Sequence, residues 1–215
     1  MIKGVIFDLD GVIVSTDELH YQGWKYMADS EGIYFDREIN ERLRGVSRME
    51  SLEIILEKAT KTYTDAQKEY LATLKNDYYK ELLTTKLSSQ DILPGVKKIL
   101  TELKAKGVKI AIGSSSKNAP TILKQIGMDA TFDAVSDGNN IINSKPDPEV
   151  FLIAAEWLGL HPADCLVVED AEAGITAALA ANMKTLAVGS AAKDKRAHLA
   201  AIDLSKISVE DIINL

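Results

Sequence analysis

Two aspartates, Asp8 and Asp10, end the first apolar segment of the chain, where the sequence reads Phe-Asp-Leu-Asp-Gly-Val. Aspartate is disfavoured inside strands, so two of them at this point require an explanation. One carboxylate can act as a nucleophile and form an acyl phosphate. The other can protonate a leaving oxygen and deprotonate an incoming hydroxyl. A lone aspartate would be compatible with a helix cap or a turn, whereas the pair favours catalysis.

A second polar group follows another apolar segment and directly precedes an expected helix. It consists of Ser114, Ser115, Ser116, Lys117 and Asn118. Hydroxyls and backbone N–H groups at the start of a helix can bind an anion, and the helix dipole assists them. The segment taken alone is also compatible with a simple helix cap.

Lys145 stands directly before Pro146, and Pro148 follows two residues later. The two prolines stiffen the loop, so the lysine can be held in one place. A lysine presented in this way is a suitable point charge for a phosphoryl group. In isolation the same residue is compatible with a solvated surface lysine.

Two further acids, Glu169 and Asp170, end the apolar segment that contains Val167 and Val168. Oxygen ligands of this kind suit Mg²⁺, which takes few carboxylates together with phosphate and water. Beside a phosphoryl group the ion would offset repulsion between an anionic nucleophile and an anionic substrate. Asp170 alone is also compatible with a helix N-cap.

The elements that must position these residues alternate along the chain. Strands are expected at residues 2–7, 108–112, 134–135, 165–168 and 185–188, and helices at 95–106, from 118 onward, at 147–158 and at 171–181. This alternation predicts an α/β fold with a doubly wound, Rossmann-like parallel sheet. Ligands bind outside the carboxyl ends of such strands, so the four polar groups are expected to converge there.

The segment between the first two strands has a different composition. It contains no proline, and its apolar residues recur at helical spacing as Leu52, Ile55, Leu56 and Ala59 and as Leu71, Leu74, Tyr78 and Leu82. These patterns predict a helical-bundle cap domain at residues 16–88, inserted into an α/β core of residues 1–15 and 89–215. Because the insertion follows the carboxyl end of the first strand, we expect it to act as a lid.

Composition excludes several classes of protein. The 215 residues carry 25 basic and 32 acidic side chains, for a net charge of −7, which argues against a nucleic-acid partner. No apolar stretch approaches the roughly 20 residues of a membrane span, and the first apolar run is too short for a signal peptide. Cys165 is the single cysteine, so no internal disulfide can form. We expect a cytoplasmic monomer without a membrane partner.

The motifs together resemble those of the haloacid dehalogenase superfamily of phosphotransferases, and the resemblance covers essentially the whole chain. They occur in the family's order as Asp8-Leu9-Asp10-Gly11, Ser114, Lys145 and Glu169-Asp170. The resemblance implies that Asp8 is the nucleophile and Asp10 the acid and base, with Ser114 and Lys145 on the transferring phosphoryl group. It implies Mg²⁺ held by Asp8, the Asp10 carbonyl and Asp170, with Glu169 nearby.

Within the superfamily, the chain most resembles the β-phosphoglucomutases. Shared features are His20 and Trp24 one helical turn apart, the segment Leu43–Arg48 followed by Ser51-Leu52, the pair Lys75-Asn76 and the segment Ser116–Asn118. The loops at Val14-Ser15 and Ser136–Asn140 depart from the family pattern. The resemblance implies substrate or phosphate contacts by Thr16, His20, Trp24, Arg44, Gly45, Val46, Ser47, Arg48, Ser51, Lys75, Ser114, Ser115, Ser116, Lys117, Asn118 and Lys145.

The implied activity is interconversion of β-D-glucose 1-phosphate and glucose 6-phosphate, with β-glucose 1,6-bisphosphate as primer and intermediate. A substrate with two phosphate positions needs a second cationic site, which Arg48, Lys117 and Asn118 can supply; the planar arginine fork suits phosphate. Two alternatives stay open. One is a magnesium-dependent sugar-phosphate phosphatase with the same core. The other is a phosphosugar-binding protein without turnover, which the intact pair of aspartates disfavours.

Overall fold

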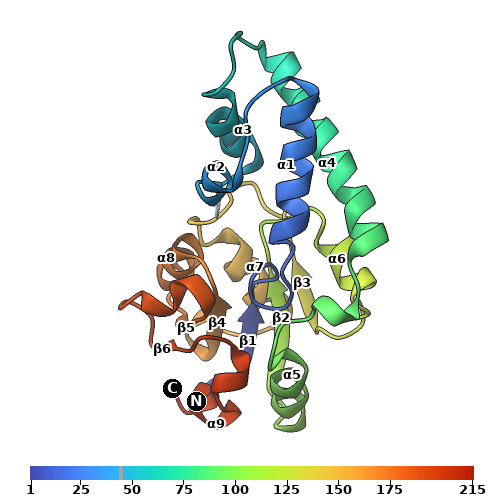
Figure 1. Cartoon of the computed structure of the whole chain (residues 1–215). Coiled ribbons are helices and arrows are strands. Elements are labelled where there is room, and N and C mark those ends of the chain that lie inside the picture. Colours follow the sequence, from blue (N-terminus) through green and yellow to red (C-terminus); the bar gives the residue numbers. More distant parts are fainter. Residues whose placement is uncertain (44–45) are drawn as a thin grey trace. The chain divides into compact units, whose positions relative to one another are not determined.

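A parallel sheet organises the first of two units of the chain, and a computed structural model describes residues 1–43 and 46–215. Within this described part the sheet has six strands, in the order β3-β2-β1-β4-β5-β6 (Figure 1). Their bounds are Gly4–Phe7 (β1), Lys109–Gly113 (β2), Ala134–Ser136 (β3), Cys165–Glu169 (β4), Lys184–Ala187 (β5) and Leu199–Ala200 (β6). The predicted doubly wound α/β fold is confirmed. The sequence did not predict β6, because two residues carry no readable alternation.

Helices flank this sheet, most of them between successive strands, and α9 follows the last strand. They are α5 (Val96–Ala105), α6 (Ala119–Gln125), α7 (Glu149–Leu158), α8 (Glu172–Ala180) and α9 (Val209–Ile213), with short 3₁₀ helices at Ser89–Asp91, Pro162–Asp164, Gly189–Lys193 and Leu204–Lys206. The central strands β1 and β4 are buried along their whole length, as expected for a sheet covered on both faces. α7 packs closely on β2, where a Cβ on Gly113 would lie 2.7 Å from the Phe151 ring.

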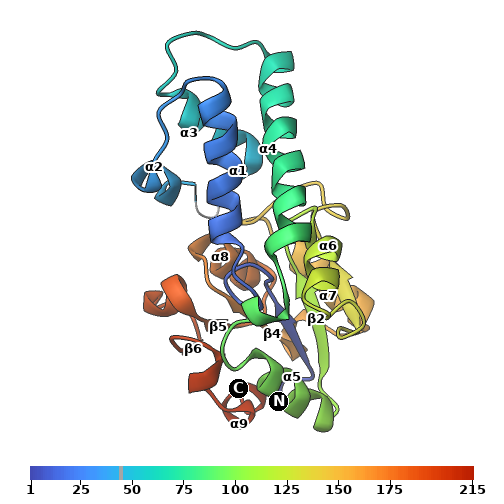
Figure 2. The ribbon, with the colours of Figure 1, turned by 45° about the vertical axis from the view of Figure 1, so that its right-hand side comes forward.

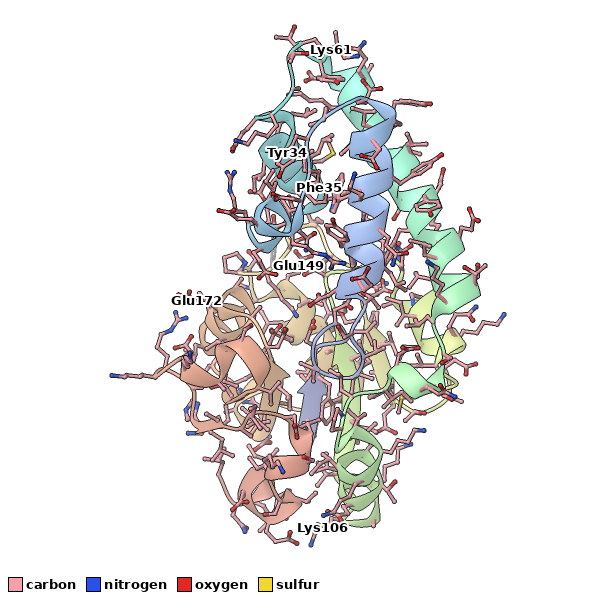
Figure 3. The ribbon with its side chains drawn as sticks, in the orientation of Figure 1. Tyr34, Phe35, Lys61, Lys106, Glu149 and Glu172 are labelled. Carbon is pink, nitrogen blue, oxygen red and sulfur yellow. The ribbon has the colours of Figure 1, made fainter. Side chains whose placement is uncertain are left out.

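The second unit is a bundle of helices. Its members are α1 (Asp17–Ser30), α2 (Arg37–Glu41), α3 (Arg48–Leu56) and α4 (Asp65–Lys86), of which α1 and α4 run side by side (Figures 1 and 2). Capping boxes at Ser47 and Thr64 define the starts of α3 and α4. Phe35, labelled in Figure 3, belongs to the core of this unit and stacks on Tyr21.

The buried face of α4 differs from the predicted one. The apolar spacing predicted a stripe that includes Leu74 and Tyr78, yet both are only partly buried. Lys75 and Tyr79 are buried instead, with exposed fractions of 2% and 0%. The prediction was wrong because it counted apolar residues only, whereas this face buries polar groups that have partners.

The two units are Met1–Ser15 with Ser88–Leu215, and Thr16–Leu87. The segment by which the chain leaves the α/β unit pairs with the segment by which it returns. Val14 and Ile92 form an antiparallel bridge, and the Leu93 N–H donates to the Ile13 carbonyl at 2.9 Å. The two chain ends also meet, because the Ile2 N–H donates to the Ile213 carbonyl at 3.0 Å (Figure 2).

Three smaller expectations can be compared with the fold. Cys165 is fully buried, as its position in an apolar strand suggests. The charged segment Lys193–Arg196, which the sequence alone would suggest as a solvated helix start, instead ends a 3₁₀ helix at Lys193 and turns, with Asp194 accepting hydrogen bonds from Arg196. Over the described residues, no helix combines the length and the apolar character that a membrane crossing needs. Arg44 and Gly45, two expected substrate contacts, lie outside the described residues.

Candidate active site

Three ionisable residues meet at the carboxyl edge of the sheet. Asp8 directly follows β1, and Glu169 is the last residue of the neighbouring strand β4. The Lys145 ammonium donates to Asp8 Oδ1 at 2.5 Å and also to Glu169 Oε1. All three side chains are at most 10% exposed. The predicted convergence of these residues is thus present within the α/β unit.

The buried ion pairs determine the charge of the lysine. Burial alone lowers the pKa of Lys145, but the facing carboxylates of Asp8 and Glu169 outweigh it and raise the pKa above its usual value. Burial raises the pKa of Glu169, and the Lys145 ammonium opposes that effect. The lysine is therefore a permanent cation beside Asp8 at physiological pH.

The loop that carries Lys145 is shaped by its own hydrogen bonds. Glu149, labelled in Figure 3, accepts from the Ile142 N–H at 3.0 Å and from the Asn143 N–H at 2.8 Å. Asp147 in turn accepts from the Glu149 N–H at 3.0 Å, and the Lys145–Pro146 peptide bond is cis. The first turn of α7 therefore orders the loop from both sides of the lysine.

An acidic cluster next to the lysine fits a metal ion. Within the described residues, Asp8, Glu169 and Asp170 each offer a ligand oxygen, and these atoms lie within 4.8 Å of one another. Opposite ligands of Mg²⁺ at 2.0–2.1 Å are about 4.2 Å apart, so the spacing suits one ion. Both Glu169 oxygens already accept hydrogen bonds, one from Lys145 and one from the Ala171 N–H at 3.0 Å. Asp8 and Asp170 are thus the better placed side-chain ligands.

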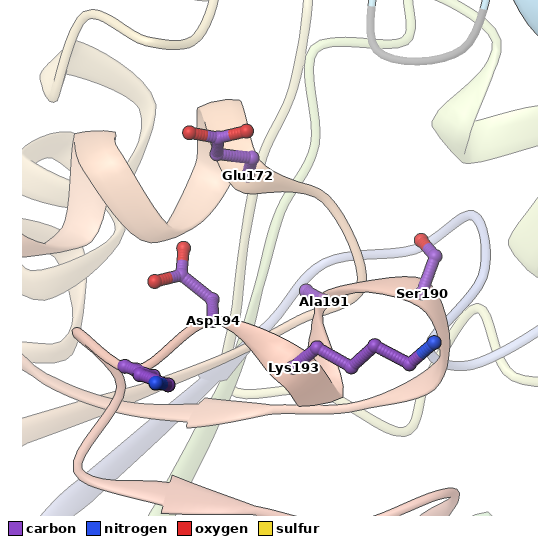
Figure 4. A pocket seen from close by; sticks show the side chains of 6 residues that line it. Glu172, Ser190, Ala191, Lys193 and Asp194 are labelled. Atoms are coloured by element: carbon purple, nitrogen blue, oxygen red, sulfur yellow. The ribbon is translucent and has the colours of Figure 1, made fainter.

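Asp170 is also held through its backbone. Its carbonyl accepts the Ser190 hydroxyl at 2.6 Å and the Ala191 N–H at 3.0 Å. Ser190 and Ala191 line a surface pocket of about 440 Å³, together with Glu172, Lys193, Asp194 and Lys195 (Figure 4). This pocket contains none of the predicted site residues. Two residues in its wall, Ser190 and Ala191, nevertheless hold the loop that bears Asp170.

Asp10 lies in a tight turn after β1. Its neighbour Gly11 has a positive φ of 81°, and the Gly11 N–H donates to the Val14 carbonyl at 2.8 Å. A Cβ on Gly11 would lie 2.1 Å from Asp170 Oδ2. The glycine is therefore needed for the turn and for the close approach of Asp170.

The predicted phosphate-binding segment follows β2, the other neighbour of β1. Ser114 is buried and its hydroxyl accepts from the Ser116 N–H at 3.2 Å, while the Ser116 hydroxyl accepts from the Asn118 N–H at 3.2 Å. Lys117 is exposed. Among the described residues, the buried Ser115 hydroxyl finds no protein partner. An unpaired buried hydroxyl costs about 1–3 kcal/mol, which an accepting oxygen from a ligand would remove.

Several predicted contacts assemble within the helical unit. The Lys75 ammonium on α4 lies 2.9 Å from His20 Nδ1 on α1 and 5.0 Å from the centre of the Trp24 ring. An ammonium can only donate, so Nδ1 is the acceptor and Nε2 carries the imidazole proton. Burial, together with the positive charges of Lys75 and Arg48, holds the pKa of His20 well below its usual value. His20 is therefore a neutral hydrogen-bond donor at Nε2.

The remaining predicted residues of the helical unit surround α3 and the start of α1. Arg48 is the first residue of α3 and donates to the Asn76 side chain at 2.9 Å. Ser47 is the N-cap of the same helix, and Ser51 is buried on it. Val46 is half-buried. Thr16 is the buried N-cap residue of α1.

Three residues that support the site are absent from the sequence predictions. Ser190 binds the Asp170 carbonyl from a later segment of the chain, and Tyr79 is not part of the predicted apolar stripe, which includes its neighbour Tyr78 instead. Gly174 lies in the first turn of α8, where an added Cβ would come within 2.0 Å of the Glu169 carboxyl group. A glycine near a helix start is the only hint that the sequence offers for it.

Comparisons with known proteins agree with this geometry. Residues 5–188 match the model of the haloacid dehalogenase-like hydrolase family. A β-phosphoglucomutase of Bacillus subtilis is 44% identical over 97% of this chain and 93% of its own length. A fructose-1-phosphate phosphatase of Escherichia coli is 31% identical over 86% of this chain and 95% of its own.

A solved structure is similar over the whole chain. The crystal structure of a β-phosphoglucomutase from Clostridium difficile has a TM-score of 0.90 and 41% identity, and the match covers 100% of this chain and 96% of that one. The resemblance in the motifs, the fold and the family model thus agree. The chain is an enzyme that belongs to the haloacid dehalogenase-like hydrolase family.

Proposed function

We propose that this enzyme interconverts β-D-glucose 1-phosphate and glucose 6-phosphate by transferring a phosphoryl group through Asp8. The observation that carries the proposal is the buried Lys145 ammonium on Asp8. It supplies a fixed positive charge at the nucleophile, where the charge of a transferring phosphoryl group would lie. The 44% identity to a β-phosphoglucomutase supports this choice of substrate.

The first proposed step transfers the phosphoryl group from phosphorylated Asp8 to bound β-D-glucose 1-phosphate. Asp10 removes the proton of the 6-hydroxyl as that oxygen attacks phosphorus, and the bond between phosphorus and the Asp8 oxygen breaks. The product is β-glucose 1,6-bisphosphate. The bisphosphate then reorients in the site. Its 1-phosphoryl group is transferred to Asp8, and Asp10 returns the proton to the leaving oxygen.

The core residues have distinct tasks in this proposal. Ser114 and Lys145 bind the transferring phosphoryl group, and Asp8, the Asp10 carbonyl and Asp170 hold Mg²⁺, with Glu169 as the anchor of Lys145. Mg²⁺, when bound there, offsets the charge repulsion between nucleophile and phosphate. Ser115, Ser116, Lys117 and Asn118 complete the phosphate contacts.

We assign the helical unit the role of a cap that excludes water and binds the sugar and its second phosphate. Arg48 binds that phosphate, and Thr16, His20, Trp24, Ser51 and Lys75 contact the substrate. Exclusion of water favours transfer to a sugar hydroxyl over hydrolysis. We further propose a cytoplasmic monomer, with sugar phosphates as its small-molecule partners.

A phosphatase is the second candidate, favoured by the 31% identity to a fructose-1-phosphate phosphatase. A ³¹P NMR time course separates the two activities. The sample contains the enzyme, Mg²⁺, β-glucose 1-phosphate and a trace of β-glucose 1,6-bisphosphate. The mutase produces glucose 6-phosphate with little inorganic phosphate. Accumulation of inorganic phosphate alone would replace the proposal with the phosphatase, and an EDTA-treated sample should be inactive in either case.

Replacing Arg48 tests the second phosphate site. We expect Arg48→Ala to lower mutase flux about 10- to 100-fold, because charge-assisted hydrogen bonds to the distal phosphate are lost. Acetyl phosphate has no second phosphate, so Arg48 can make no charge-assisted bond to it. The rate of its hydrolysis should therefore stay within about threefold of the wild-type rate. Arg42→Ala is the control, because Arg42 pairs with Glu57 on the surface. Equal losses in both reactions would contradict the assignment.

Replacing Gly174 tests the packing behind Glu169. A glycine-to-alanine change in a helix is ordinarily stabilising by about 0.5–1 kcal/mol. Here the new methyl group would overlap the Glu169 carboxyl group, so we expect Gly174→Ala to displace the anchor of Lys145 and lower kcat about 10- to 100-fold. Thr176→Ala on the same helix serves as the control. A Gly174→Ala enzyme that is more stable and fully active would contradict this reading.

A further inference from the structure

Tyr79 is fully buried on α4 and contacts three residues that the proposed function places at the substrate. Its hydroxyl donates to Thr16 Oγ1 at 3.0 Å. Its ring centre lies 4.1 Å from that of His20, with the planes 31° apart, and 4.5 Å from the Lys75 ammonium.

The hydrogen bond from Tyr79 to Thr16 reaches the start of α1. Thr16 occupies the N-cap position, where a threonine side chain normally accepts a hydrogen bond from the helix backbone. In this structure it makes no such bond and accepts from Tyr79 instead. The hydroxyl of Tyr79 therefore ties the first turn of α1, which leads to His20, to α4.

The contacts of the ring concern the pair formed by Lys75 and His20. An aromatic face attracts a cation, so the Tyr79 ring holds the ammonium on the side where it donates to His20 Nδ1. The same ring packs against the imidazole with the two planes tilted by 31°, and this contact restricts the orientation of the imidazole. Gly23 allows this approach, since a Cβ there would lie 3.1 Å from Lys75 Cε and 3.5 Å from Tyr79 Cβ.

We propose that Tyr79 is a positioning residue of the phosphotransfer site. It holds Lys75 and His20 in the one arrangement in which His20 keeps its proton on Nε2, and it fixes the helix turn before His20 through Thr16. The catalytic consequence of this role rests on the proposed function. The effect on the histidine does not, because the tautomer can be measured without turnover.

The first test reads the tautomer of His20 by ¹H–¹⁵N long-range NMR at neutral pH. The chain has three histidines, so His161→Gln and His198→Gln identify the remaining signals. The wild-type protein should show the Nε2–H form of His20. Tyr79→Leu should shift His20 toward a mixture of tautomers, whereas Tyr79→Phe, which keeps the ring, should retain the wild-type pattern.

The matched control for this test is the adjacent residue Tyr78. It stacks on Tyr26 at 4.2 Å and is only partly buried, so Tyr78→Leu should leave the His20 signal unchanged. A folded Tyr79→Leu protein with the wild-type His20 tautomer would overturn the role of the ring. A shift caused equally by Tyr78→Leu would overturn it as well.

The second test concerns the hydroxyl and remains decisive if Tyr79→Leu does not fold. Tyr79→Phe should lower the ratio of mutase flux to phosphate release about 3- to 10-fold, the range that one hydrogen bond supports. Thr16→Val removes the acceptor, so the double variant should lose no more than the stronger single variant. Fully additive losses would overturn this part. If the enzyme proves to be a phosphatase, the tautomer result still decides the role of the ring.

Discussion

Asp8→Asn is expected to abolish turnover. The amide keeps the size of the carboxylate and can still accept the hydrogen bond from Lys145, but it cannot form the acyl phosphate. The loss in kcat should reach about 10⁶-fold, the size seen when an enzyme loses its covalent nucleophile. Uptake of phosphate from ³²P-labelled acetyl phosphate should disappear together with the mutase reaction.

The control for this variant is Asp164→Asn. Asp164 directly precedes β4 at its amino end and forms a surface pair with Lys3, so turnover should be unaffected. Mass spectrometry must establish that position 8 carries an amide, since deamidation restores the aspartate. Turnover retained by homogeneous Asp8→Asn protein would rule out covalent transfer through this residue.

Lys145→Ala is expected to impair both activity and stability. Without the ammonium, the buried carboxylates of Asp8 and Glu169 lose their common partner. Breaking a buried ion pair from one side costs about 3–5 kcal/mol, which chemical denaturation would show as a lower midpoint. Loss of the fixed charge at the phosphoryl group should lower kcat about 10²- to 10³-fold.

A double variant separates these two effects. Lys145→Met with Glu169→Gln removes the cation and one of the two facing carboxylates, so much of the lost stability should return. Activity should not return, because the charge beside Asp8 is still missing. Lys3→Ala, which breaks a surface pair, should change neither quantity appreciably. Recovery of activity in the double variant would show that Lys145 is a structural cation only.

Most of the α/β fold could be predicted because its strands are short apolar runs that end in polar residues. Residues 2–7 and 165–168 show this pattern, and the structure has β1 and β4 there. The strand β6 could not be predicted, because two residues are too few to show an alternation and only the pairing with β5 makes them a strand.

The core of the site was predictable for a general reason. The carboxyl ends of parallel strands lie at one edge, so Asp8, Lys145 and Glu169 could be placed together without knowledge of any side-chain contact. That Glu169 uses both of its oxygens to hold Lys145 and the Ala171 N–H could not be foreseen. Such bonds depend on loop geometry, which spacing does not encode.

The face of α4 shows where pattern reasoning fails. A search for apolar residues at helical spacing selects Tyr78, although the helix buries Lys75, Asn76 and Tyr79. A polar residue belongs to the interior when it has partners there, and the partners of Lys75 lie more than fifty residues away on α1. The hydrogen bond from Ser190 to the Asp170 carbonyl could not be predicted for the same reason.

The order of the strands also bears on how the chain folds as it is synthesised. β1 is made first, yet it lies between β2 and β4, so both of its neighbours emerge much later. The helical unit is complete before β2 exists, and helical bundles as a class fold rapidly. Once folded, it shortens the loop whose closure brings Val14 to Ile92. Until β4 is synthesised, one edge of the apolar strand β1 has no partner strand. An unpaired strand edge promotes aggregation, so the nascent chain is most prone to aggregate at this stage.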